Sequence, residues 1–199
     1  MVKIHTSTAI AAQQASSNIL NIVKALGNNT FKVRLGSEKD FEAVNKLMND
    51  ILATEFLHGP ELIKESEEND TVAKELSLAL EEDGYFLVVE NNNGELIGSG
   101  ALMRASHTIH QGNPDLWSGE KVAELTKIYL HPNYRGQGIG KWIVEALLEQ
   151  AKKLGYKKAY IAAFKEFETA NHIYLKAGFT VIPNRQHLDD LTVEMEREL

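Results

Sequence analysis

The stretch "HPNYRGQGIGKWIVEALLEQAKKLG", residues 131–155, places three glycines at alternate positions directly before a long amphipathic helix. A strand ends near Leu130, Pro132 turns the chain, and residues without a Cβ leave backbone N–H groups uncovered at the helix start. Uncovered N–H groups and the helix dipole attract anions, so we predict a phosphate or pyrophosphate site in this stretch. The helix itself is predicted by apolar residues at helical spacing, namely Ile143, Val144, Leu147, Leu148, Ala151 and Leu154.

Two common phosphate-binding motifs do not fit the stretch. The P-loop requires G-x-x-x-x-G-K-[ST], but Lys141 is followed by Trp142 and the hydroxyl is missing. The dinucleotide fingerprint requires G-x-G-x-x-G, whereas the glycines stand at positions 136, 138 and 140. The anion site is therefore of another kind, to which Arg135 and Lys141 add positive charge.

The segments on either side alternate between strand and helix patterns. "FKVRL" alternates as a strand, and Ser37 and Asp40 form a capping box for the helix that follows. An acidic helical region, residues 60–82, breaks near Asp70, which could cap its second helix. "YFLVVE" and "ELIGSGALMRAS" form a hairpin, "VAELTKIYL" and "KAYIAAF" are strands, "FETANHIYLKAG" is a helix, and "FTVIP" and "LTVEMERE" close the chain as strands. This order predicts an α/β fold with a mixed sheet and helices on both faces.

Residues 1–30 differ in composition from the rest of the chain. A small polar segment precedes apolar residues at helical spacing (Ile19, Leu20, Ile22, Val23 and Leu26), with Gly27 as a stop. We expect an N-terminal helical arm over residues 1–30 and one domain over residues 31–199. The apolar side of the arm packs on its own domain or forms a homodimer contact, and both alternatives stay open.

The composition excludes several classes of protein. The chain has 199 residues, no cysteine, 43% hydrophobic and 25% charged residues, which is typical of one soluble domain without disulfides or thiolate metal sites. A net charge of −7 argues against nucleic-acid partners, and no apolar run reaches the roughly 20 residues that cross a membrane. No signal or transit peptide is evident, so we expect a cytoplasmic protein. His107 and His110 lack a third ligand nearby, so we expect no metal.

Two motifs together resemble the GNAT superfamily of acyl-CoA-dependent N-acyltransferases. "YRGQGIG" matches the pattern [RQ]-x-x-G-x-[GA] with Arg135, Gly138 and Gly140, and "ANHIYLKAGF" follows some thirty residues later. The resemblance covers residues 31–199 and implies a mixed, mainly antiparallel sheet of about six to seven strands. It also implies direct transfer of the acetyl group of acetyl-CoA to a primary amine, whether a small amine, an amino acid, a polyamine or a protein amine.

The resemblance also implies which residues bind the coenzyme. The loop at residues 135–140 would wrap the pyrophosphate, the preceding strand would pair with the pantetheine arm, and this strand would splay from "KAYIAAF" to open a slot. Many members carry an asparagine seven residues before the tyrosine of the second motif, where this chain has Phe167, and Asn171 lies one turn later. The expected coenzyme-binding residues are Ile128, Leu130, Arg135, Gly136, Gln137, Gly138, Ile139, Gly140, Lys141, Asn171 and Lys176.

Glu124 and Tyr174 are the expected catalytic residues. An attacking amine must lose a proton, and Glu124 on the strand entering the slot is the candidate base, acting through a water. Tyr174 stands where the family often places the acid that protonates the departing thiolate. The structural alternatives are a surface ion pair for Glu124 and core packing for Tyr174. The acceptor site is expected between the first helix, the acidic helical region and the loop before Glu124, with His107, His110, Trp117 and Tyr129.

Two other functions remain open at this point. One is a non-catalytic acyl-CoA-binding or regulatory module that kept the coenzyme loop, and the other is a protein that uses the loop for ATP or NAD. For an enzyme, positioning the reactants supplies about 7–11 kcal/mol and acid–base catalysis roughly 3–5 kcal/mol. We therefore expect that blocking the loop harms turnover more than removing Glu124.

Overall fold

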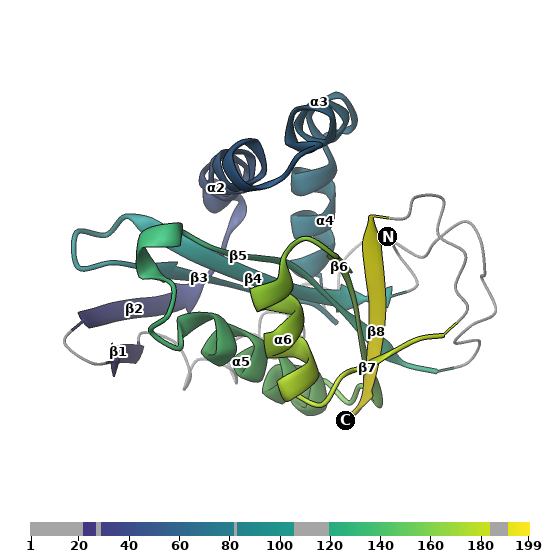
Figure 1. Ribbon diagram of the computed structural model, residues 1–199. Coiled ribbons are helices and arrows are strands. Elements are labelled where there is room, and N and C mark those ends of the chain that lie inside the picture. The colour runs from purple at the N-terminus through teal and green to yellow at the C-terminus, as the bar shows by residue number, and fades with distance from the viewer. Residues whose placement is uncertain (1–21, 27–28, 82, 106–119, 184–190) are drawn as a thin grey trace, which may run out of the picture.

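Eight strands form one sheet, and helices cover both of its faces (Figure 1). The computed structural model describes residues 22–26, 29–81, 83–105, 120–183 and 191–199. The strand order is β1-β2-β3-β4-β5-β6-β8-β7. Every neighbouring pair is antiparallel except β5 and β6, which are parallel. The elements are β1 (Ile22–Leu26), β2 (Asn29–Leu35), η2 (Glu38–Asp40), α2 (Phe41–Glu55), α3 (Gly59–Asn69), α4 (Thr71–Ala79), β3 (Tyr85–Glu90), β4 (Leu96–Arg104), β5 (Val122–Leu130), η4 (Pro132–Tyr134), α5 (Ile139–Lys153), β6 (Lys158–Phe164), α6 (Glu168–Lys176), β7 (Thr180–Val181) and β8 (Thr192–Glu198).

The predicted mixed α/β sheet with helices on both faces is confirmed. Helices α2, α3 and α4 lie on one face and α5 and α6 on the other (Figure 1). Each face has its own hydrophobic core: Val44, Met48, Leu52, Val72 and Leu76 fill the first, and Ile143, Val144, Leu147, Leu148 and Ala151 fill the second. Most buried residues of α2 and α5 are thus apolar residues at helical spacing in the sequence, and Gln150 is the polar exception.

Strand β1 stands where the sequence predicted part of an N-terminal helix, and that prediction was wrong for these residues. Ile22–Leu26 is β1, which pairs antiparallel with β2 from Ile22 opposite Val33 to Leu26 opposite Asn29. Five residues are too few for periodicity to separate a helix from a strand, and Ile22 and Val23 are β-branched. Strand β2 begins at Asn29, before the expected start of the domain at residue 31. Residues 1–21 and Gly27 lie outside the described part, so the rest of the arm and its homodimer contact stay predictions.

The acidic helical region divides at Asp70 as predicted, although the capping is different. Asp70 lies between α3 and α4 with a φ of 49°, and its side chain makes no capping hydrogen bond. Its backbone carbonyl instead accepts a hydrogen bond from the N–H of Lys74 at 3.1 Å. Helix α4 packs on the face of the sheet that also carries α2, and α3 lies against α2 and α4 on the same side of the sheet (Figure 1).

Asp40 joins the first helix to the sheet. Its carboxylate accepts hydrogen bonds from the backbone N–H and hydroxyl of Ser37 at 2.8 and 3.0 Å, which completes the predicted capping box. It also accepts two from the guanidinium of Arg34 in β2, at 2.6 and 2.9 Å, and Arg34 makes a third at 2.6 Å to Glu90 in β3. The hydrogen bonds from Arg34 hold the pKa of Asp40 below its ordinary value, although burial opposes them.

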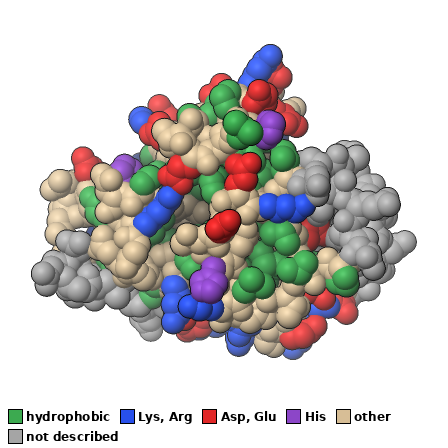
Figure 2. Space-filling view, in the orientation of Figure 1, with side chains coloured by type: hydrophobic (Ala, Val, Ile, Leu, Met, Phe, Trp, Pro, Cys, Tyr) green, Lys and Arg blue, Asp and Glu red, His purple; other side chains and the backbone are tan. Residues whose placement is uncertain are grey.

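The surface of the described residues carries mixed charges. On the face that shows α6, acidic and basic side chains are interspersed (Figure 2). Among the described helices, none combines the length and the apolar character that crossing a membrane requires.

Asp40→Asn should lower the free energy of unfolding at pH 7 by about 1–3 kcal/mol, because Arg34 loses a charged hydrogen-bond partner. The pKa of Asp40 is lowered in the folded protein, so the carboxylate makes its full contribution to stability when the pH is well above the ordinary pKa of aspartate. This contribution is lost as the pH falls from that ordinary pKa toward the lower pKa of the folded state. Urea unfolding of both proteins over a pH series measures the difference. Asp50→Asn, which removes an exposed partner of Lys46, is the matched control and should change stability little. The prediction would be contradicted if the difference in unfolding free energy between wild type and Asp40→Asn stayed constant down to about pH 3, below the ordinary pKa of carboxyl groups.

Candidate active site

The sheet opens where β5 and β6 part. Their parallel pairing runs through Val122 with Lys158, Ala123 with Ala159, and Glu124 with Tyr160, and within the described residues it ends there. Strand β6 continues to Phe164 paired with β8, whereas residues 125–130 continue toward the glycine loop (Figure 1). These two strands therefore part as expected, and Glu124 lies at the last paired position, the closed end of the opening.

An extra residue in β5 creates a β-bulge beside this opening. Ser99 lies opposite Tyr129 and Ala101 opposite Thr126, so β5 has one residue more than β4 over the same span. Lys127 takes the strain with a φ of 50°, and its carbonyl accepts a hydrogen bond from the Ser99 hydroxyl at 2.7 Å. The bulge brings Thr126 and Lys127 together toward α4.

Glu75 of α4 holds these two side chains. Its Oε2 accepts hydrogen bonds from the Thr126 hydroxyl at 3.0 Å and from the Lys127 ammonium, also at 3.0 Å. Burial lowers the pKa of Lys127, but Tyr129, Glu75 and Glu124 outweigh it and raise that pKa above its ordinary value. The Lys127 ammonium is therefore a positive charge held by Glu75, and it also acts electrostatically on Glu124.

Glu124 is buried, with 8% of its surface exposed, and so it is not the surface carboxylate that one sequence alternative described. Its Oε2 has no hydrogen-bond partner among the described residues. Burial, together with the negative charge of Glu75, raises the pKa of Glu124 to about 8, and Lys127 partly opposes this rise. A carboxyl group with such a pKa can exchange a proton near neutral pH.

Tyr174 reaches the same region from α6. It is 5% exposed, and its ring lies edge-on to Phe179 with 6.3 Å between the ring centroids. Burial raises the pKa of its hydroxyl, and the neighbouring Tyr129 raises it further. Tyr174 therefore packs in the core, as one sequence alternative described, and also lies beside a residue of β5.

The glycine loop leads directly into α5. Gly136 and Gly138 have φ angles of 74° and 82°, which disfavour residues with a Cβ. Gly138 immediately precedes the helix, no side chain caps it, and the first intrahelical bond runs from the N–H of Trp142 to its carbonyl at 3.0 Å. The N–H groups of the first helical turn therefore have no partner within α5. The preceding turn is fastened to the β3–β4 hairpin, because the Tyr134 hydroxyl accepts a hydrogen bond from Asn91 at 3.0 Å.

The backbone of β5 faces the opening just before this loop. The N–H of His131 donates to Ile97 in β4 at 2.8 Å, and backbone groups alternate in direction along a strand. Those of Ile128 and Leu130 therefore point away from β4 toward the space that β6 has left. The carbonyl of Leu130 accepts a hydrogen bond from Arg135 Nε at 3.2 Å.

The other expected coenzyme-binding residues lie around the start of α5, with two exceptions. Arg135 forms a 2.6 Å ion pair with Glu55 at the end of α2, and Lys141 pairs with Glu145 at 3.5 Å. Ile139 is buried in the core, Gln137 is half-buried, and Gly140 faces Ile173 of α6. The exceptions lie in α6: Lys176 is exposed at its last position, and Asn171 lies near its start.

The side chain of Asn171 binds the backbone at the end of β6. Its side-chain N–H groups donate to the carbonyls of Phe164 and Lys165 at 2.9 and 3.3 Å, whereas its Oδ1 is buried without a hydrogen-bond partner in the described residues. Phe167, which stands at the position of the family asparagine, packs against Phe56 and Phe164 with centroid separations of 5.8 and 5.9 Å. An aromatic cluster thus replaces a polar contact at this position.

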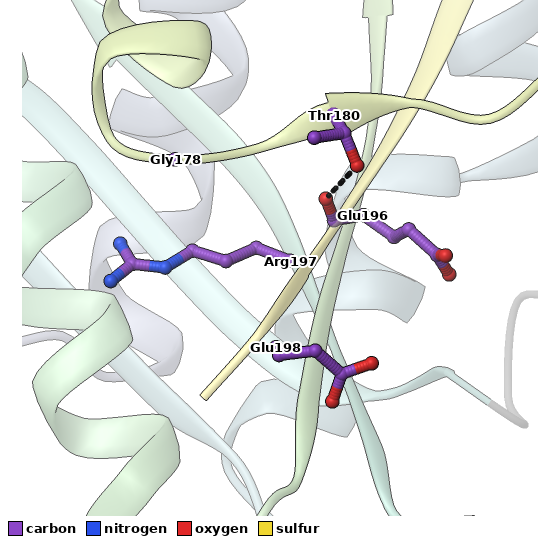
Figure 3. A pocket seen from close by; sticks show the side chains of 5 residues that line it. All are labelled: Gly178, Thr180, Glu196, Arg197 and Glu198. Carbon is purple, nitrogen blue, oxygen red and sulfur yellow. Dashed lines mark hydrogen bonds between the residues drawn. The ribbon is translucent and has the colours of Figure 1, made fainter.

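Several expected acceptor contacts lie outside the described residues, namely His107, His110 and Trp117. In the described ranges, no three His, Asp or Glu side chains are grouped so that they could hold a metal ion. A pocket of about 300 Å³ lies elsewhere, on β7 and β8, lined by Gly178, Thr180, Glu196, Arg197 and Glu198 (Figure 3). It contains none of the expected site residues, and Arg197 donates a hydrogen bond to the carbonyl of Ala177.

Sequence reasoning missed Glu75, Lys127 and Glu55. Glu75 and Glu55 stand among many acidic residues of helices, and nothing local distinguishes them. Lys127 lies within a strand pattern, and the extra residue that turns it toward α4 is visible only in the pairing with β4.

Comparison with known proteins gives consistent matches. Residues 45–179 match the model of the Acetyltransferase (GNAT) family. The uncharacterized N-acetyltransferase YjgM of Escherichia coli is 28% identical, over 63% of this chain and 71% of that protein. An amino-acid acetyltransferase of Pasteurella multocida is 27% identical over 60% of this chain, but the match spans only 23% of its length. The structure of the PaiA N-acetyltransferase of Thermoplasma acidophilum in complex with coenzyme A has a TM-score of 0.63 and 20% identity, covering 85% of this chain and 99% of that one.

Gly138→Ala should lower the free energy of unfolding by about 1–2 kcal/mol, because an L-residue is strained at its φ of 82°. Gly140→Ala is the matched control, since its Cβ would meet only Ile173 Cδ1, at 3.4 Å. Alanine inside a helix should leave stability unchanged or raise it by up to about 1 kcal/mol. Chemical unfolding measures both variants, and equal losses would show that the left-handed backbone at Gly138 does not matter.

Proposed function

Because this chain belongs to the Acetyltransferase (GNAT) family and is an acyltransferase of that family, we propose that it transfers the acetyl group of acetyl-CoA directly to a primary amine. The observation that carries this proposal is the arrangement at the opening between β5 and β6. A helix start without a side-chain cap lies at the open end, and a buried carboxyl group with a raised pKa lies at the closed end. These are the two features that a charged coenzyme and an amine deprotonation require.

The residues around the opening fit a coenzyme with a diphosphate and an amide-containing arm. The uncapped N–H groups at the start of α5 would hold the pyrophosphate, with Arg135 beside them and with Gly136, Gly138 and Gly140 leaving the backbone accessible. The backbone of Ile128 and Leu130 would pair with the pantetheine arm, and the unpartnered Oδ1 of Asn171 would accept a hydrogen bond from one of its amides. When bound, the coenzyme supplies an activated thioester.

Glu124 is proposed as the base for the attacking amine. With a pKa of about 8, it holds a proton at lower pH and accepts one, through a water molecule, as the pH rises. Burial is the main cause of this raised pKa, and Glu75 of α4 and Lys127 in the bulge of β5 are proposed to adjust it, since they are the charged groups that act on Glu124 among the described residues. Their charges act in opposite directions.

Tyr174 is proposed as the acid that protonates the departing thiolate. Burial and the neighbouring Tyr129 raise its pKa, so its hydroxyl keeps its proton until a basic group appears beside it. Its position on α6, next to Ile173, which faces Gly140, supports this role.

The acceptor is proposed to be a small amine, an amino acid, a polyamine or a protein amine. The name of the Pasteurella multocida relative supports amino acids among these candidates. We favour catalysis over a binding-only module because Glu124 is a buried carboxyl group, at the closed end of the opening, whose Oε2 has no hydrogen-bond partner among the described residues. A cytoplasmic location is part of the same proposal.

Thermal unfolding with coenzyme A, acetyl-CoA, ATP and NAD in parallel tests the coenzyme assignment. A ligand at about 100 times its dissociation constant adds about 2.7 kcal/mol, which shifts the transition by several degrees. We expect the two coenzyme A compounds to shift the wild type, and Gly138→Glu to abolish the shift by placing a negative charge in the loop. A shift with ATP or NAD alone would assign the loop to a nucleotide-binding protein instead.

The pH dependence of acetyl transfer tests the Glu124 cluster. Glu124→Gln should lower kcat/KM by about 10²–10⁴-fold with the best amine of a panel, followed by free-thiol release. The wild-type rate should rise with pH with an apparent pKa near 8. Glu75→Gln removes a neighbouring negative charge and should move this limb to lower pH, whereas Lys127→Met should move it to higher pH. General structural damage does not produce opposite shifts, so two shifts of the same sign would refute the assignment.

A further inference from the structure

The end of α2 contacts both sides of the opening between β5 and β6. Glu55, its last residue, pairs with Arg135 after β5. The next residue, Phe56, packs against Phe164 at the end of β6 with 4.6 Å between the ring centroids. The N–H of Leu57 then lies 3.5 Å from the Glu166 carboxylate. Three consecutive residues therefore bridge the slot in which the coenzyme is proposed to lie.

The ion pair of Glu55 involves the arginine that is proposed to bind phosphate. Arg135 donates from Nε to the Leu130 carbonyl at 3.2 Å and from one terminal nitrogen to Glu55 Oε2 at 2.6 Å. A guanidinium binds a phosphate and a carboxylate with the same planar set of donors. The two anions would therefore compete for one side chain.

We propose that Glu55 is a built-in competitor for the coenzyme's phosphates at Arg135 and thereby sets the affinity for the coenzyme. This inference rests on the proposed function, because it assumes that the phosphates bind at the start of α5. On binding, the Arg135–Glu55 ion pair is exchanged for an Arg135–phosphate ion pair, and no covalent bond changes.

The position of Glu55 keeps its carboxylate near the loop after Arg135 has exchanged it for a phosphate. Phe56 is 5% exposed and contacts both Phe164 and Phe167, which anchors the end of α2. The Glu55 carboxylate, once released, therefore stays near the loop and repels the phosphates. It also lies at the negative C-terminal end of a helix dipole, where only a nearby cation such as Arg135 favours a carboxylate.

The hydrogen bond from Arg135 to Leu130 distinguishes a Glu55 that competes for Arg135 from a Glu55 that only positions it. Arg135 Nε remains tied to the Leu130 carbonyl when Glu55 is removed, so the guanidinium keeps one anchor beside the glycine loop. Loss of Glu55 should therefore free the terminal nitrogens without releasing the side chain. A residue that merely positioned Arg135 would have the opposite effect on binding.

Calorimetric binding of coenzyme A and of pantetheine, which has the thiol arm but no phosphate, tests the inference. Glu55→Gln should lower the dissociation constant for coenzyme A about two- to tenfold, as expected from a weak exposed ion pair and a removed repulsion. The affinity for pantetheine should not change. Asp50→Asn, which removes a charge from the same helix away from Arg135, is the matched control and should leave both affinities unchanged.

A double-mutant cycle with Arg135→Gln identifies the route of the effect. The gain from Glu55→Gln should become smaller in the Arg135→Gln background, because no guanidinium is left to compete for and only the loss of the direct repulsion remains. Equal or weaker coenzyme A binding by Glu55→Gln would overturn the inference, as would an equal gain in both backgrounds. If wild type binds neither coenzyme A nor acetyl-CoA, the proposed function fails first and the inference falls with it.

Discussion

The parallel pairing of β5 and β6 stops after three residue pairs, and the rest of the site depends on this interruption. Every other neighbouring pair in the described sheet is antiparallel, so the sheet opens at its one parallel pair. Their separation leaves the backbone of β5 open as far as the glycine loop. It also allows three structures to meet at one opening: the start of α5, the start of α6 and the end of α2.

Most of the fold could be predicted from the sequence because its signals are local. The apolar spacing of α5 and the glycines before it lie within a few turns of one helix, and the hairpin of β3 and β4 follows from its turn residues. Strand β1 could not be predicted, because five residues fit either pattern and only the pairing with β2 decides between them. In the same way, Glu124 was evident on its strand, but the partners that act on it, Glu75 and Lys127, come from another helix and from a bulge.

The charged groups of the opening are arranged at some cost to stability. A carboxyl group with a pKa near 8 is disfavoured in its ionised form inside the protein, and Lys127 has a positive φ that disfavours most side chains. Elsewhere the same protein uses charges in the opposite way: Arg34 lowers the pKa of Asp40 and fastens a helix to the sheet. Near the opening, Glu124 is thus left with an oxygen that has no hydrogen-bond partner among the described residues, whereas Asp40, just before α2, is paired with Arg34.

The single extra residue in β5 divides that strand into two halves with opposite side-chain alternation. Before it, Ala123 and Leu125 face the core under α5; after it, Ile128 and Leu130 do so, although simple alternation would turn them to the other side. An insertion of one residue therefore lets a hydrophobic strand and a polar site share nine consecutive positions. A strand without this extra residue can accordingly be aligned with β5 only in two halves, because a single ungapped alignment would exchange core residues for site residues in one of them.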